Sequence, residues 1–271
     1  MPLAAAPVQH IEVEPGVRLA VSVSGAADKP AILFSNSLAA AIGTWDEVAE
    51  RLAPYAHLIR YDTRGHGRSD APPTGYGLDR LGADAVALLD ALQIERAVVC
   101  GLSLGGLTGM WLGIHAAKRL AGLVLANTAP NFPPPALWLD RAKAARDGGV
   151  AQFVEPSLAR WFTQRFRAAA PARVAEIAGI IAATSPVGYA GCCEVLAATD
   201  LSADLASISC PVRVIVGDQD PSTPPERGAE IIAAIPDTDL VTLAAAHLSA
   251  VEASDAFAAA LIDFLPRLRG S

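Results

Sequence analysis

Long apolar runs, paired cysteines and positive charge are all scarce in this chain of 271 residues. No apolar run approaches the roughly 18 residues that a membrane-spanning helix needs, so we expect no membrane partner. Residues 1–10 contain no lysine or arginine, and a secretory signal peptide normally starts with such charge. The four cysteines show neither C-x-x-C spacing nor a disulfide framework; they are Cys100, Cys192, Cys193 and Cys210. These absences predict a reduced, cytoplasmic protein.

The net charge of −7 argues against nucleic acid as a partner, because nucleic-acid binding requires a basic surface. The charge is also unevenly distributed. Residues 131–199 carry seven basic and five acidic side chains, a net +2, so the remainder of the chain carries −9. A basic segment on an acidic body could attract an anionic substrate. Ordinary solvated helix faces would give the same counts, so charge alone leaves both interpretations open.

Apolar runs and helical spacing alternate along most of the chain. Strands are expected at 17–24, 31–35, 58–61, 120–126, 212–216 and 240–243, and immediately before Gly101. Helices are expected at 45–52, 78–92, 104–115, 224–235 and 254–265. Strands that alternate with helices predict an α/β protein with a mostly parallel sheet covered on both faces.

The alternation stops at Pro130. The following Asn131-Phe132-Pro133-Pro134-Pro135 suits neither a helix interior nor a central strand. From there to residue 199 the pattern is helical without strands. We therefore expect an α/β core formed by residues 1–130 and 200–271, with residues 131–199 inserted as a helical cap.

A serine between glycines follows the strand expected before Gly101. The sequence Gly101-Leu102-Ser103-Leu104-Gly105 has the G-x-S-x-G spacing of a nucleophile elbow, placed between a strand and a helix. Such a turn exposes the serine hydroxyl above the sheet edge and needs small neighbours. Ser103 is the candidate nucleophile; the alternative is a plain turn with a serine that caps the helix.

A serine nucleophile needs a base, and five histidines are available. His247 directly follows the last strand, where open α/β sheets place their active sites. His66, in a glycine-rich loop, is not excluded by the sequence. The base in turn needs a carboxylate, and the penultimate strand ends in Asp218 and Asp220. We favour Asp220 and keep Asp218 as the alternative; either gives the order serine, acid, histidine. The strand expected at 120–126 ends in Asn127, an amide that cannot carry the charge, so the acid is not expected there.

Two backbone N–H groups should stabilise the oxyanion that forms during acyl transfer. One is expected from Leu104, the residue after the nucleophile. The other should come from the loop after the strand at 31–35, where we choose Leu38. No cofactor or metal is expected. The pair Gly65 and Gly67 lacks the third glycine and the acidic partner of a dinucleotide site.

With these residues in place, the chain resembles the α/β-hydrolase family from about Val17 to Leu265, and in detail the 3-oxoadipate enol-lactonases. The resemblance is carried by Ser-Asn-Ser-Leu at 35–38, Gly-Tyr-Ala-Gly-Cys-Cys at 188–193 and Ala-His-Leu-Ser-Ala-Val-Glu at 246–252. Ala250 departs from the asparagine expected there. The resemblance implies an eight-stranded sheet with a helical cap.

By the same resemblance, the substrate is a small anionic enol-lactone and the product is 3-oxoadipate, formed during bacterial breakdown of protocatechuate or catechol. Its carboxylate needs a cationic partner, best a guanidinium. We choose Arg141 and Arg160 because each lies near a cap tryptophan, Trp138 or Trp161. We expect a monomer or small homo-oligomer. Another esterase or lactonase, a cofactor-free perhydrolase and a non-catalytic receptor of this fold remain alternatives.

Overall fold

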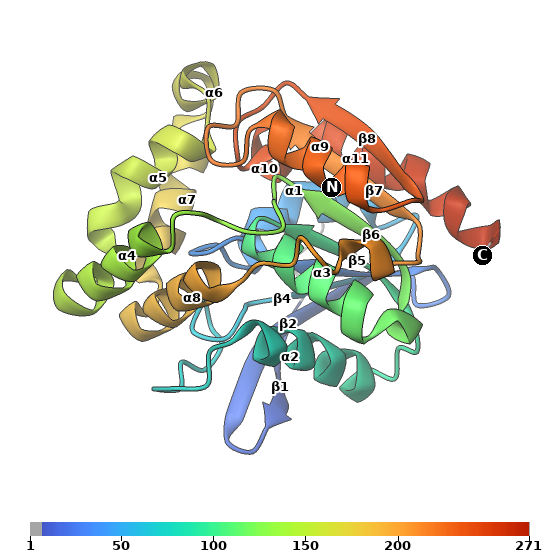
Figure 1. Ribbon diagram of the computed structural model, residues 1–271, viewed down its shortest axis with the longest axis horizontal. Helices are drawn as coiled ribbons and strands as arrows, with labels where there is room; N and C mark the ends of the chain where they lie inside the picture. Colours follow the sequence, from blue (N-terminus) through green and yellow to red (C-terminus); the bar gives the residue numbers. More distant parts are fainter. Residues whose placement is uncertain (1–6, 271) are drawn as a thin grey trace.

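The structure is a computed structural model that describes residues 7–270, without the side chains of 269 and 270. Residues 1–6, on which part of the expectation about a signal peptide depends, lie outside the described residues. One eight-stranded sheet forms the centre, with the strand order β1-β2-β4-β3-β5-β6-β7-β8 (Figure 1). The strands are β1 (Val8–Glu14), β2 (Val17–Gly25), β3 (Ala31–Ser35), β4 (His57–Tyr61), β5 (Ala97–Leu102), β6 (Leu120–Ala126), β7 (Val212–Gly217) and β8 (Thr238–Leu243).

β2 runs antiparallel to its two neighbours, β1 and β4. From β4 onward along the sheet, each strand pairs in parallel with the next, in the order β4-β3-β5-β6-β7-β8. Every residue of β5 and β7 is buried. Strands covered on both faces have this continuous apolar character, because neither side of the sheet meets water. The predicted fold class, a mostly parallel α/β sheet of eight strands, is confirmed.

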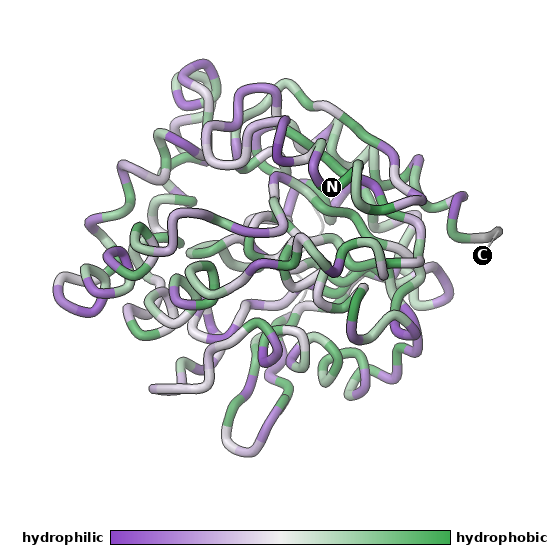
Figure 2. Tube along the Cα trace, viewed as in Figure 1, coloured by the Kyte–Doolittle hydropathy of each residue, from purple (hydrophilic) through white to green (hydrophobic). Residues whose placement is uncertain are grey.

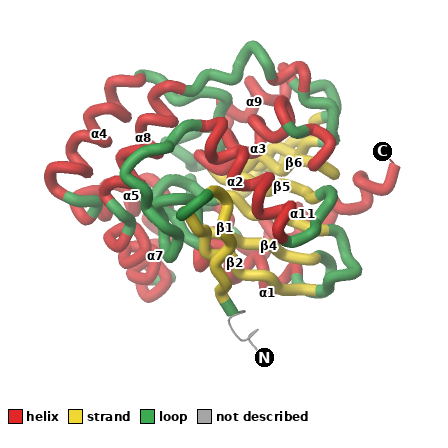
Figure 3. Tube along the Cα trace, turned by 90° about the horizontal axis from the view of Figure 1, so that it is seen from below, coloured by secondary structure: helices red, strands yellow, loops and turns green. Residues whose placement is uncertain are grey.

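Helices cover the sheet on both sides (Figure 3). α3 packs against β5, β6 and α2, whereas α1 packs against α11. The helices outside the insertion are α1 (Asp46–Leu52), α2 (Leu78–Ala91), α3 (Leu104–His115), α9 (Pro225–Ala234), α10 (Ser249–Glu252) and α11 (Ser254–Phe264). Figure 2 shows the apolar residues gathered along the central strands and the polar residues on the outer turns.

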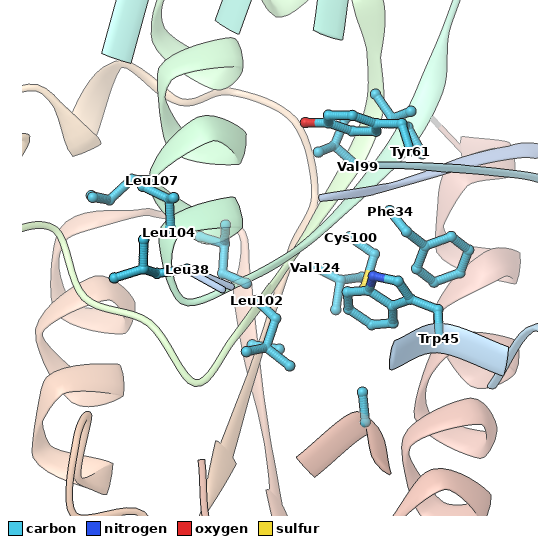
Figure 4. Close-up of a cluster of buried hydrophobic side chains, with 14 of the residues drawn as sticks. Phe34, Leu38, Trp45, Tyr61, Val99, Cys100, Leu102, Leu104, Leu107 and Val124 are labelled. Carbon is cyan, nitrogen blue, oxygen red and sulfur yellow. The ribbon is translucent and has the colours of Figure 1, made fainter. Parts of the chain in front are cut away.

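Part of the apolar core lies beneath the carboxyl ends of the strands (Figure 4). Trp45 is completely buried, with its ring 4.8 Å from the ring of Phe34 between centroids. The indole N–H of Trp45 donates to Asn36 Oδ1 at 2.6 Å. This bond fixes the loop that follows β3, because a buried N–H must find an acceptor.

Five helices lie between β6 and β7 and form the cap, at one end of the molecule (Figure 1). α4 and α8 pack along each other. The helices are α4 (Pro135–Gly148), α5 (Val154–Trp161), α6 (Gln164–Ala169), α7 (Pro171–Ala183) and α8 (Pro186–Ala198). Within residues 7–270, no single helix is long and apolar enough to cross a membrane; the pair α7 and α8 would suffice by length and composition, but it is bent by 91°.

At one place the cap backbone packs directly against the backbone of the loop after β4. A Cβ built on Gly65, in the loop after β4, would lie 2.2 Å from the Cα of Gly188 in α8. A Cβ on Gly188 would lie 2.3 Å from the Cα of Gly65. Neither position can carry a side chain without separating the two segments.

Candidate active site

Ser103 stands at the turn between β5 and α3, in a conformation that is rare for a residue with a side chain. Its φ is 57° and its ψ is −113°. Its backbone N–H donates to Ala126 O in β6 at 3.0 Å, and Thr128 Oγ1 donates to its carbonyl at 2.7 Å. These bonds hold the strained turn in place, as such conformations require.

Glycine is required on both sides of this turn. A Cβ on Gly101 would lie 2.1 Å from the carbonyl oxygen of Gly105, one turn further along. A Cβ on Gly105 would lie 2.1 Å from the carbonyl oxygen of Ser35. The elbow therefore presses directly against the end of β3, which brings the loop after β3 next to the start of α3.

His247 and Asp220 meet at the carboxyl ends of the neighbouring strands. His247 Nδ1 lies 2.8 Å from Asp220 Oδ2, and both side chains are buried. The contact uses the Nδ1 atom, so Nε2 is the nitrogen left to act on a substrate. Asp218 is exposed instead, and its carboxylate accepts from the neighbouring Gln219 at 3.2 Å. Of the two candidate acids, the structure brings Asp220 to His247.

The Asp220 carboxylate accepts several further hydrogen bonds. Thr223 Oγ1 donates to Oδ2 at 2.6 Å, and Asn127 Nδ2 donates to it at 3.0 Å. Burial raises the pKa of Asp220, but the charge of His247 and the hydrogen bonds from His247, Thr223 and Asn127 outweigh it and lower the pKa to about 2. Asp220 is therefore ionised at neutral pH and can stabilise a positive imidazole.

His66, the other histidine left open by the sequence, occupies a different place. It is fully buried in the loop after β4, with Nδ1 3.1 Å from the carbonyl oxygen of Arg64. Burial lowers the pKa of His66 to about 4. The residues described around the cavity of Ser103 include His247 but not His66.

The two expected oxyanion donors come from adjacent segments. Leu104 begins α3, so its N–H has no carbonyl partner within the helix. Leu38 lies in the loop after β3, within a turn closed by Ala40 N–H and Ser37 O at 3.1 Å. Figure 4 shows the side chains of Leu38 and Leu104 next to each other. The arrangement suits the assignment of both N–H groups to one oxyanion, which stays a prediction.

A cavity lies between the elbow and the cap. Its lining contains Ser103 and His247 together with all four residues that we expected to contact substrate. The full lining is Ser37, Leu38, Ala39, Ser103, Phe132, Trp138, Arg141, Ser157, Arg160, Trp161, Tyr189, Leu196, Ser222 and His247. The structure thus brings the expected base, nucleophile and cationic side chains to one chamber.

Arg141 is held rigidly at the wall of this chamber. Its Nε donates to Tyr189 Oη at 3.0 Å, and its Nη2 donates to the same oxygen. Its guanidinium lies 5.0 Å from the ring centroid of Phe153 and 5.3 Å from that of Trp138. A guanidinium fixed in this way loses little conformational entropy when it binds a carboxylate.

Arg160 is half-buried beside Arg141. Burial and, after it, the positive charge of Arg141 lower the pKa of Arg160. Among the described residues, no aspartate or glutamate forms an ion pair with either arginine. Two neighbouring cations without a carboxylate partner favour binding of an anion between them.

Several residues around the site were not among those predicted from the sequence. Asn127, at the end of β6, joins Asp220 to Ser249, whose hydroxyl donates to Asn127 Oδ1. Its position at a strand end next to the elbow is the signal that could have identified it. Thr223 and Tyr189 act through contacts between distant segments, which a single sequence does not reveal. Within residues 7–270, no three His, Cys, Asp or Glu side chains gather as a metal site would require.

Comparison with known proteins now assigns the chain to a class. Residues 30–254 match the family described as alpha/beta hydrolase fold. The match runs from just before β3 to α11 and includes the cap. The chain belongs to the α/β-hydrolase family.

Relatives within that family define the group more closely. The chain is 41% identical over 241 residues to 3-oxoadipate enol-lactonase 2 of Acinetobacter baylyi, covering 89% of this chain and 90% of the relative. It is 37% identical over 242 residues to 3-oxoadipate enol-lactonase 1 of the same organism, covering 89% and 91%. The crystal structure of the enol-lactonase from Burkholderia xenovorans LB400 superposes with a TM-score of 0.92 at 36% identity, covering 96% and 100%. The chain is a carboxylic ester hydrolase, related to the 3-oxoadipate enol-lactonases.

Proposed function

We propose that the protein hydrolyses 3-oxoadipate enol-lactone to 3-oxoadipate, as the names of its relatives indicate for those proteins. The observation that carries the proposal is the chamber itself. It combines Ser103 and His247 with two arginines, Arg141 and Arg160, that lack carboxylate partners among the described residues. An anionic lactone has both groups that this chamber suits: an ester bond that the serine can attack and a carboxylate that the arginines can bind.

The first half of the reaction opens the ring. His247 Nε2 accepts the proton of Ser103 while Oγ bonds to the lactone carbonyl carbon. The backbone N–H groups of Leu38 and Leu104 stabilise the oxyanion. The bond between that carbon and the ring oxygen then breaks, and the leaving enol oxygen takes the proton from His247. The enol becomes the ketone of the product.

The second half releases the acyl chain. Water gives a proton to His247 and attacks the acyl carbon, and the bond to Ser103 Oγ breaks as His247 returns the proton to that oxygen. Asp220 stays ionised throughout, since its pKa is about 2. Its role is to hold His247 with the proton on Nδ1 and to stabilise the imidazolium.

The carboxylate arm of the substrate binds at the arginines. Arg141 supplies the rigid guanidinium, because Tyr189 and the surrounding rings fix its plane. Arg160 adds the second charge, and Trp138 and Trp161 provide apolar walls for the ring. We propose the cytoplasm as the place of action, where the four free thiols stay reduced. The proposed partner is this small anion alone, and the protein acts as a monomer or small homo-oligomer.

A spectrophotometric assay of enol-lactone hydrolysis tests the proposal. Ser103→Ala should lower kcat by about 10²-fold or more. Arg141→Gln and Arg160→Gln should raise KM for the lactone by about 10- to 100-fold, because a hydrogen bond to a charged group contributes about 1.5–3 kcal/mol. Arg167→Gln is the matched control, since Arg167 pairs with Glu155 on the exposed side of the cap.

The neutral ester p-nitrophenyl acetate separates hydrolysis at Ser103 from carboxylate binding by the two arginines. KM for this ester should change by less than about threefold in the two arginine variants, since it has no carboxylate to lose. An equal rise of KM for both substrates would disprove carboxylate binding by that arginine. Rapid turnover of neutral esters or peracid formation, with no lactone hydrolysis, would instead favour another esterase or a perhydrolase.

A further inference from the structure

Glu252 lies at the end of α10, five residues after His247, and its carboxylate joins two parts of the protein that are far apart in the chain. Its Oε2 accepts the backbone N–H of Ala246, the residue before His247, at 3.0 Å. The same oxygen accepts the backbone N–H of Thr163 in the cap at 3.2 Å. The Thr163 hydroxyl donates to Oε1. One carboxylate therefore binds both the histidine loop and the cap.

A second bond ties the same two segments together on the other side of His247. The backbone N–H of Leu248 donates to the carbonyl oxygen of Trp161 at 3.0 Å. Trp161 lines the chamber, and its carbonyl ends α5 just before Thr163. Both chain neighbours of His247 are thus fixed to residues 161–163, one directly and one through Glu252.

The start of α6 depends on the same contacts. Thr163 caps that helix, since its Oγ1 accepts the N–H of Phe166 at 3.1 Å while it donates its own proton to Glu252. Hydrogen bonds that involve an ionised carboxylate are stronger than neutral ones. The charge of Glu252 therefore stabilises the geometry of the junction more than a neutral acceptor would.

We propose that Glu252 is a positioning residue. It holds the imidazole of His247 at a fixed position relative to Trp161, the cap residue that lines the chamber. The proposal depends on the proposed role of His247 as the base. Glu252 touches no reacting atom; it acts through the backbone on either side of the histidine. Displacing a catalytic group by about 1 Å can cost about 10²-fold in rate, so loss of this link should affect the chemical step.

Three substitutions test the role. Glu252→Ala removes the link, and Glu252→Gln keeps one acceptor oxygen without the charge. Thr163→Val removes the hydroxyl, which donates to Glu252 and also caps α6. Glu155→Gln is the matched control, because Glu155 also joins α5 to α6, by its pair with Arg167, without reaching the histidine loop. The readouts are kcat and KM for p-nitrophenyl acetate, the rate of Ser103 labelling by a fluorophosphonate, and the urea midpoint.

We expect Glu252→Ala to lower kcat and the labelling rate by about 10- to 100-fold, with KM changed by less than about threefold. Glu252→Gln should recover part of the lost rate, and Thr163→Val should lower kcat by about three- to tenfold. A folded Glu252→Ala variant with kcat within about twofold of the parent would overturn the proposal. If that variant fails to fold, an unchanged kcat in Thr163→Val overturns it instead.

Two further variants separate this proposal from the proposed function. If Ser103→Ala or His247→Ala keeps the ester hydrolysis of the parent, the catalytic assignment itself fails. If both are inactive while the Glu252 and Thr163 variants behave like the parent, only the positioning role fails. A loss of kcat in Glu155→Gln equal to that in Glu252→Ala would also overturn it, because the effect would then follow from any change at the junction of α5 and α6.

Discussion

The strained backbone of Ser103 leads to a prediction about stability that is independent of the substrate. At φ 57° and ψ −113°, the residue occupies a region that glycine enters freely and residues with a Cβ do not. Ser103→Gly should relieve this strain, whereas Ser103→Ala should keep it. Both variants lack the hydroxyl, so their difference reports the backbone alone. The Ser103 side chain forms no cap hydrogen bond to α3 in the structure, so its removal breaks none there.

The size of the effect follows from two opposing contributions. A sparsely populated backbone conformation costs about 1–3 kcal/mol. Glycine also gains more conformational freedom in the unfolded chain than alanine does, which costs about 0.4–1 kcal/mol. The difference leaves Ser103→Gly more stable than Ser103→Ala by about 1 kcal/mol. For a domain of this size, that corresponds to a rise in Tm of about 2–4 °C.

The assay is urea unfolding followed by far-UV circular dichroism, with both variants measured side by side. Ala175→Gly is the control, because Ala175 lies exposed within α7, where glycine should lower stability by about 1 kcal/mol. The two glycine substitutions should therefore shift the midpoint in opposite directions. If Ser103→Gly unfolds at the same or a lower urea concentration than Ser103→Ala, the elbow is not strained and the reasoning fails.

Three other predictions concern pH and glycine. Because the pKa of Asp220 is lowered to about 2, its ionised form stabilises the folded state above pH 4, by about 2 kcal/mol, and this contribution is lost as the pH falls toward 2. Urea unfolding from pH 6 to pH 2.5 should thus show the difference between the parent and Asp220→Asn narrowing below pH 4; a constant difference would contradict the lowered pKa. Gly105→Ala should abolish fluorophosphonate labelling, since its Cβ would meet Ser35 O at 2.1 Å, and normal labelling would exclude that close contact. Gly179→Ala should raise the free energy of unfolding by about 0.5–1 kcal/mol, because its Cβ would meet no atom within 4 Å inside α7, and a lower urea midpoint would count against this.

Most of the sheet could be predicted from the sequence because its central strands are buried on both faces. β3 and β6 have the expected bounds, and α3 does too. Non-apolar residues or proline flank the apolar runs of both strands. β1 has no counterpart among the strands expected from the pattern. Its consecutive Gln9 and His10 interrupt the alternation, and only Val13 in it is buried. An edge strand that depends on one partner leaves a weak pattern.

The residues of the site also fall into those that could be predicted from the sequence and those that could not. Ser103, His247 and Asp220 could be picked out because each follows a strand within a few residues, and the ends of parallel strands meet at one edge. The structure brings them together with the cap arginines, while their catalytic roles stay predictions. The role of Glu252 could not be found, because it rests on contacts with a segment distant in the chain. Short motifs identify chemistry, whereas the residues that orient it depend on the tertiary fold.

The backbone contact between Gly65 and Gly188 has a consequence for how this enzyme can change. Because neither glycine tolerates a side chain, the cap is anchored at a fixed distance from the sheet. A new substrate preference would then arise from exchanging side chains on α4 and α5. The backbone contact between Gly65 and Gly188 would stay in place, and the cap would not shift as a whole. A mutant library for altered specificity should vary positions such as Trp138 and Ser157 and leave both glycines untouched.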